Sequence, residues 1–144
     1  MCDAASIRSH GWDHVTYGSF SATLAAGKLL GLTEEQLVHA IGIAGTINNS
    51  MRQPRVGELS MWKGCAFANS SRNALFCAQL ARAGLSGPAP IFEGEMGFWK
   101  QISGPFTLDI DQFGGGERPF MIDRTYIKFW PAEYHSQSAI DAAL

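Results

Sequence analysis

The chain has 144 residues, of which 46% are hydrophobic and 17% are charged, and its formal net charge is −2. This length and hydrophobic content suit one compact domain with a single core, so a disordered chain is excluded. The charge is sparse and contains no basic run, which argues against binding to nucleic acid or to a membrane surface.

Two helices are predicted in the first third of the chain. In residues 17–31 the apolar side chains recur at helical spacing, and Gly31 stands where a C-terminal cap belongs. In residues 32–48 the pair Thr33 and Gln36 has the spacing of a capping box, in which each side chain bonds the other residue's backbone N–H.

A third helix is predicted over residues 61–84, which are rich in alanine and end on glycine. Residues 85–105 mix proline, glycine and aromatic residues, which favours short helical turns. After the glycine run 114–116, residues 120–130 are predicted as a strand because β-branched and aromatic residues gather there. The final residues, 136–144, begin a further helix.

This order of elements predicts a mainly α fold. We expect residues 1–113 to form part of a helical bundle, and residues 117–144 to supply the first strand and helix of a smaller α/β domain. A new helix at the last residues of the sequence has nothing after it to pack against, so the chain is expected to be a piece of a longer protein.

Cysteine usage and hydropathy predict a soluble, cytoplasmic protein. Cys2, Cys65 and Cys77 have no spacing typical of a metal site. Cys65 and Cys77 are expected about 18 Å apart on one helix, beyond the reach of a disulfide, which favours reduced thiols. No apolar run approaches the roughly 20 residues of a membrane span, and the N-terminal residues lack the apolar core of a signal peptide.

His14 is the histidine most suggestive of chemistry. It follows Asp13 just before a predicted helix, and a neighbouring carboxylate can set the tautomer of an imidazole and raise its basicity, as a general base requires. A solvated loop explains the same residues equally well. His39 is interpreted as an ordinary residue on a helix face, and His10 as a loop residue.

Several cations could bind an anion. Lys63 lies at the start of an apolar helix, where a lysine opposes the helix dipole, so it is either an anion ligand or a surface residue. Arg52 and Arg55 lie in a proline-broken loop and could clamp carboxylates bidentately. Lys128 lies among apolar neighbours in the predicted strand and projects either into solvent or into a cleft.

Pro131 forces an extended turn that presents Glu133 and His135 ahead of the last helix.

Other chemistry lacks support in the sequence. The sequence has no glycine-rich dinucleotide fingerprint, no phosphate-binding loop, no nucleophile elbow and no CxxC pair. The remaining lysine, arginine and histidine side chains suit a small polycarboxylate.

Three segments, in this order, resemble the MmgE/PrpD family: CDAASIRSHGWDHVTYGSFSATLAAGKLLGLT, SMWKGCAFANSSRNALF and FWPAEYHSQSAIDAA. Members of that family include 2-methylcitrate dehydratase and cis-aconitate decarboxylase. The WPAEYHSQ segment is more similar to the dehydratase branch. Family members are much longer, and their upstream segment, with a further histidine and aspartate of the site, has no counterpart here.

The resemblance implies a large helical domain and a smaller α/β domain with the active site between them. It also implies a homodimer and chemistry that needs no metal or cofactor. His14, Lys63 and Lys128 are similar to active-site residues of the family. Three further residues near the same motifs are candidates for binding substrate: Asp13, Arg52 and His135.

The implied function is that of a lyase resembling 2-methylcitrate dehydratase, which eliminates water from a hydroxy tricarboxylate in propionate catabolism, within the methylcitrate cycle. Lys63 and Lys128 would bind carboxylates and stabilise developing charge, and His14 would transfer a proton. One alternative is loss of carbon dioxide, as in the decarboxylase branch. Another is an inactive fragment that serves only as a helical association module.

Overall fold

The computed structural model describes residues 6–144, so Cys2 lies outside the described residues. The chain divides into two units, Met1–Leu108 and Asp109–Leu144. The described residues form helices and helical turns and contain no strand, which confirms the mainly α prediction. None of the described helices is both long and apolar enough to cross a membrane.

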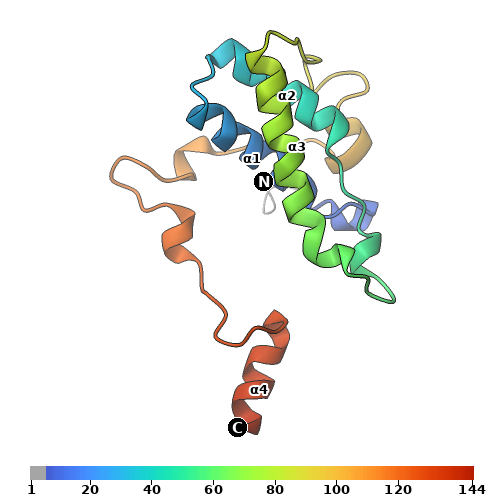
Figure 1. The fold of residues 1–144 in the computed structure, drawn as a ribbon, viewed down its shortest axis with the longest axis vertical. Coiled ribbons are helices and arrows are strands. Elements are labelled where there is room, and N and C mark those ends of the chain that lie inside the picture. Colours follow the sequence, from blue (N-terminus) through green and yellow to red (C-terminus); the bar gives the residue numbers. More distant parts are fainter. Residues whose placement is uncertain (1–5) are drawn as a thin grey trace. The chain divides into compact units, whose positions relative to one another are not determined.

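The first unit is built on three helices, α1 (Val15–Leu29), α2 (Glu34–Ile47) and α3 (Trp62–Arg82), each of which packs against the other two (Figure 1). Small residues permit this close packing. A Cβ added at Gly18 of α1 would lie 2.5 Å from the ring of Phe67 on α3.

The ends of these helices follow the sequence signals. The backbone N–H of Gln36 donates to Thr33 Oγ1 at 3.2 Å, and the backbone N–H of Thr33 donates to Gln36 Oε1 at 3.0 Å, so the predicted capping box is confirmed. Gly31 follows the last cap residue of α1 with a φ of 71°, a conformation that glycine adopts without strain.

The core face of α3 is formed by small side chains. Ala74 and Ala78 are fully buried, and Cys77 is buried beside Ile43 of α2. Cys65 is exposed on the same helix, so both described cysteines lie on α3, as predicted. Because these side chains are short, α3 can approach both α1 and α2 closely.

Residues 85–108 cover α1 and α2 with turns and aromatic side chains, and a wide helical turn at Trp99–Ser103 confirms the predicted short turns. The rings of Phe20, Phe92 and Phe98 meet in one cluster, with Phe20 and Phe98 edge to face at 5.1 Å. The chain comes so close to α2 here that a Cβ on Gly42 would lie 2.3 Å from the carbonyl oxygen of Pro88.

The second unit corrects the strand prediction. Met121–Arg124 is a 3₁₀ helix, and the residues from there to Trp130 have no regular structure. A strand needs a partner for its backbone groups, and none of the described residues supplies one. The predicted terminal helix is present as α4 (Gln137–Ala143), and the Gln137 side chain accepts from the backbone N–H of Trp130 at 2.9 Å.

Candidate functional site

The candidate site lies where the segment before α1 meets the loop after α2. The backbone N–H of Asp13 donates to the carbonyl of Ser50 at 2.8 Å, and that of Arg52 donates to the carbonyl of Gly11 at 2.9 Å. Trp12 and Met51 form an antiparallel bridge between these hydrogen bonds. Residues far apart in the sequence are therefore held in register at the start of α1.

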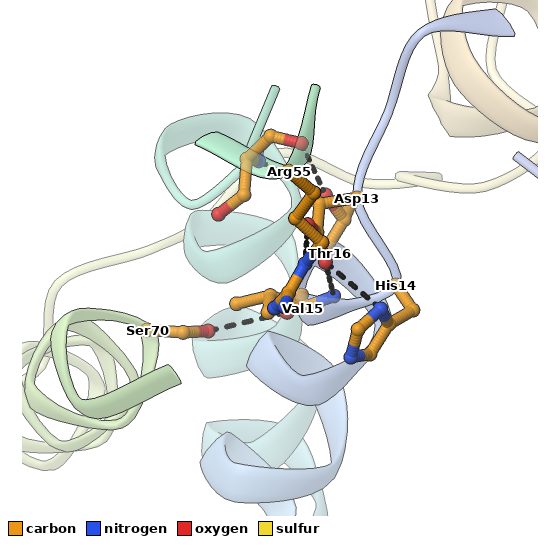
Figure 2. A network of polar contacts seen from close by, with 7 residues as sticks. Asp13, His14, Val15, Thr16, Arg55 and Ser70 are labelled. Atoms are coloured by element: carbon orange, nitrogen blue, oxygen red, sulfur yellow. Dashed lines mark hydrogen bonds and ion pairs between the residues drawn. The ribbon is translucent and has the colours of Figure 1, made fainter. Parts of the chain in front are cut away.

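Asp13 lies at the centre of this site (Figure 2). Its side chain is only 2% exposed. Its Oδ1 accepts from the backbone N–H of Val15 at 3.0 Å and lies 3.0 Å from Nδ1 of His14. Its Oδ2 accepts from Nε of Arg55. The carboxylate thus neutralises a helix N-terminus and holds two side chains at once.

The surroundings keep Asp13 ionised. Burial by itself raises the pKa of a carboxyl group, but the Val15 N–H, Arg55 and His14 together outweigh it and hold the pKa of Asp13 below its ordinary value. Arg55 is therefore the counter-ion of a buried carboxylate.

The surroundings of His14 favour its neutral form. Burial lowers its pKa, Asp13 raises it, and Arg55, Arg8 and Arg52 lower it further, with a net decrease from the ordinary value. A neutral ring beside an ionised carboxylate donates from Nδ1, which leaves Nε2 unprotonated. The side chain of His14 is 44% exposed, so Nε2 is accessible to another molecule.

A buried network of hydrogen bonds fixes the backbone that follows Asp13 and His14. Thr16 Oγ1 accepts from the backbone N–H of Ser50 at 2.9 Å, and Ser70 Oγ donates to the carbonyl of Val15 at 3.3 Å. The side-chain amide of Asn48 donates to the carbonyl of Ser70 at 3.0 Å. These bonds join the start of α1, the end of α2 and the middle of α3.

A pocket of about 400 Å³ opens beside Asp13. Its lining comes from the loop after α2 and the first turns of α3, and consists of Asp13, Asn49, Ser50, Met51, Gln53, Pro54, Glu58, Ser60, Trp62, Ala66 and Asn69. The Oδ1 atom of Asn49 is buried without a hydrogen-bond partner. The pocket has room for a small polar molecule and offers it several hydrogen-bonding groups.

The predicted site residues fall into three groups. Asp13 and His14 are in direct contact, as the sequence interpretation required. Arg52 caps the 3₁₀ turn Gln53–Arg55, and Lys63 lies in the first turn of α3, next to the pocket residue Trp62.

Lys128 and His135 belong to the second unit. Lys128 is exposed there, and the backbone N–H of His135 donates to the carboxylate of Glu133 at 2.6 Å. The roles of these two residues stay predictions.

The other two histidines serve the fold. Nδ1 of His10 lies 2.7 Å from the carbonyl of Ile102, and Nδ1 of His39 accepts from the backbone N–H of Gly87 at 3.3 Å. Among the described residues, no group of three histidine, cysteine or acidic side chains is placed to hold a metal ion.

Sequence reasoning does not assign Arg55 and Asn49 to the site. The sequence indicates Arg55 only as one of two arginines that could clamp a carboxylate, and the carboxylate that it binds belongs to Asp13. Asn49 carries no signal beyond the polar composition of its loop. Its place in the pocket wall becomes visible only when α2 and α3 are packed.

Comparison with known proteins gives a consistent result. The model of the MmgE/PrpD N-terminal domain matches residues 1–111. A 2-methylcitrate dehydratase of Escherichia coli K12 is 28% identical over 152 aligned residues, which cover 96% of this chain and 29% of that protein. An alkylcitrate dehydratase of a fungal species is 33% identical over 137 residues, which cover 94% of this chain and 27% of that protein.

A third relative carries a different name. A cis-aconitate decarboxylase-like protein of Aspergillus oryzae is 35% identical over 94 residues, which cover 65% of this chain and 19% of that protein. The chain thus spans less than a third of the length of these relatives.

Proposed function

The chain belongs to the MmgE/PrpD family, and from that premise we propose that it carries part of the active site of a hydro-lyase that needs no metal and acts on a hydroxy tricarboxylate such as 2-methylcitrate. The observation that supports this proposal most directly is the dyad: Asp13 holds Nδ1 of His14 at 3.0 Å, and Asp13 itself lines the pocket. Names of relatives support the substrate class.

Elimination of water needs three kinds of group. A base removes the carbon-bound proton, an acid protonates the departing hydroxyl, and cations hold the carboxylates and stabilise the developing enolate charge. His14 with a free Nε2 is suited to proton transfer. Lys63 and Lys128 are proposed to bind carboxylates, with Arg52 and His135 as further substrate-binding residues.

Decarboxylation is the second candidate. It is favoured by the relative named as cis-aconitate decarboxylase-like. The same cations would stabilise the carbanion left when carbon dioxide departs, and His14 would protonate it after Nε2 has taken up a proton from solvent. The two reactions differ in their products, so product analysis separates them.

A role in association is the third candidate. Many large apolar side chains of the described residues are exposed, among them Met61 at 95% and Leu29 at 89%. Exposed apolar surface of this kind favours contacts with further protein, including a second copy in a homodimer.

We propose that the whole protein is cytoplasmic and acts in propionate catabolism.

The test is ultraviolet absorbance of the 144-residue chain mixed with 2-methylcitrate, which reports a conjugated alkene. A rise in this signal should fall by about 10²-fold or more in His14→Gln, as for a general acid or base, and should also fall in Lys63→Met. Lys28→Met, which removes an exposed lysine in the last turn of α1, is the matched control and should leave the signal unchanged.

Two results would contradict the proposal. One is carbon dioxide release with a decarboxylated product, which would favour the second candidate. The other is a folded chain that neither turns over 2-methylcitrate nor shifts its His14 resonances when the tricarboxylate is added, which would favour the association role.

A further inference from the structure

Arg55 reaches the dyad from a different part of the chain. It is the last residue of the 3₁₀ turn Gln53–Arg55, and its Nε donates to Oδ2 of Asp13. The other carboxylate oxygen, Oδ1, faces Nδ1 of His14 and the N–H of Val15. The carboxylate is therefore held from two sides, and the contact with Arg55 fixes the plane in which Oδ1 is presented.

His14 lies in a field made mostly of cations. Arg8 from the turn before α1, and Arg52 and Arg55 from the turn after α2, act on it, while among residues 6–144 Asp13 is the anion that does so. Of the three arginines, Arg55 is the one that forms an ion pair with Asp13 in the part of the chain that the structure describes. Removing Arg55 therefore changes geometry and charge together, whereas removing Arg52 changes charge alone.

We propose that Arg55 is a positioning residue that acts through Asp13 to hold the ring of His14 with its Nδ1–H on the carboxylate and its Nε2 free for proton transfer. The proposal deepens the function given above and rests on His14 being the proton-transfer residue. Arg55 is not assigned a contact with substrate. Its contribution is the orientation of a carboxylate that is itself 2% exposed.

The turn that carries Arg55 also forms the pocket wall. Gln53 and Pro54, the two residues before Arg55, line the pocket. A molecule that enters the pocket therefore touches the turn whose last residue holds Asp13. The turn thus touches the pocket through Gln53 and Pro54 and the Asp13 carboxylate through Arg55.

The direction of the charge effect follows from the contacts. Arg55 competes with His14 for the charge of Asp13, and the guanidinium lowers the pKa of His14. Without it, the carboxylate binds the imidazolium more strongly, so the pKa of His14 rises. A general base acts in its neutral form, so the acidic limb of the pH–rate profile should move to higher pH.

The test is a pH titration of the imidazole nitrogens of His14 by NMR in the 144-residue chain, with His14→Gln to assign the resonances. In the unchanged chain we expect the tautomer protonated at Nδ1. In Arg55→Met we expect a higher titration midpoint and a mixture of tautomers. Arg55→Gln keeps a hydrogen-bond donor for Asp13, and it replaces Arg55→Met in this titration if Arg55→Met fails to fold.

Two control variants separate positioning from charge. Arg52→Met removes a cation that forms no ion pair with Asp13, so it should raise the midpoint and leave the tautomer unchanged. Arg72→Met removes an exposed arginine of α3 whose guanidinium bonds the side chain of the neighbouring Asn73, and should change neither. A tautomer in Arg55→Met that equals the one in Arg52→Met would overturn the proposal.

Turnover gives a second readout. We expect Arg55→Met to lower kcat by about tenfold, a part of what a general base contributes, and to leave KM nearly unchanged because Arg55 does not touch substrate. The NMR titration needs no turnover, so the two proposals fail separately. Absent dehydration in every variant, together with His14 resonances that do not shift when the tricarboxylate is added, would refute the function, and an unchanged tautomer would refute the role of Arg55.

Discussion

At the scale of single residues, the site depends on one buried carboxylate. Asp13 receives hydrogen bonds from a backbone N–H and a guanidinium, and it orients an imidazole. A buried charge is tolerated only when such partners replace its water. The same contacts that orient His14, the proposed proton-transfer residue, therefore also stabilise the fold.

Replacing this carboxylate should cost stability in a pH-dependent way. We expect Asp13→Asn to lower the free energy of unfolding at pH 7 by about 2 kcal/mol, the range of hydrogen bonds to a charged group. The folded pKa of Asp13 is lowered, so its contribution is present above the unfolded pKa and is lost as pH falls through the folded value. Urea denaturation at several pH values measures this difference.

A fall in pH also removes the contribution of His14 to folding stability. Its folded pKa is lowered, so its contribution to stability is lost as pH falls from the unfolded value of 6.5 toward the folded one. His14→Gln should therefore reduce the dependence of the free energy of unfolding on pH in the range just below pH 6.5. Asp13→Asn should reduce this dependence only at lower pH. Equal curves for both variants and the unchanged chain would refute the assignment of these shifts.

At the scale of elements, the sequence predicted helices well and the strand badly. The capping box of Thr33 and Gln36 predicts where α2 begins, and this local signal does not depend on the rest of the chain. The apolar and aromatic residues around Tyr126 have β propensity, but propensity becomes a strand only beside a partner strand. No described residue provides that partner, so Tyr126 stays 95% exposed.

Close packing against α2 can be tested with two glycines in helices. A Cβ at Gly42 would meet the backbone carbonyl of Pro88 at 2.3 Å, and backbone cannot move aside cheaply, so Gly42→Ala should lower stability by about 1–3 kcal/mol. Gly64 of α3 has open space around it, so Gly64→Ala should raise stability by about 0.5–1 kcal/mol. Thermal denaturation of both variants gives the comparison, and a stabilised Gly42→Ala would contradict this packing.

The candidate site could be predicted only in part. Asp13 and His14 are neighbours in sequence, so adjacency alone is enough to predict their contact. Arg55 contacts Asp13 from 42 residues away, and Asn49 joins the pocket wall through the packing of α2 and α3. Nothing local distinguishes Arg55 from Arg52; only Arg52 is predicted from the sequence as a site residue, and the tertiary structure shows that Arg55 is the one that holds Asp13.

At the scale of the whole molecule, the two units differ in how they are stabilised. The first unit has buried apolar clusters around Phe20 and around Ile43. In the second unit none of the helical elements has a buried residue, and Ile127 and Phe129 are 94% and 84% exposed. The first unit therefore holds the only described residues that form a hydrophobic core.

This difference predicts unequal protection. In native-state hydrogen exchange, we expect amides of α1 and α3 to exchange at the rate of global unfolding, and amides of residues 114–130 to exchange much faster. Brief trypsin digestion should likewise cut after Arg124 or Lys128 first, because exposed, weakly bonded backbone is cleaved most readily. Slow exchange throughout residues 114–130 would show that this segment is covered in solution.

The bridge between Trp12 and Met51 has a consequence for how the site comes into existence. It joins the two sides of a loop that contains both α1 and α2, and closing such a loop costs chain entropy before any contact repays it. Helices can form early from local signals, but the ion pair of Asp13 with Arg55 needs this closure. The arrangement of Asp13, His14 and Arg55 thus forms late in folding, and the proton-transfer role proposed for His14 requires a molecule that has completed its long-range contacts.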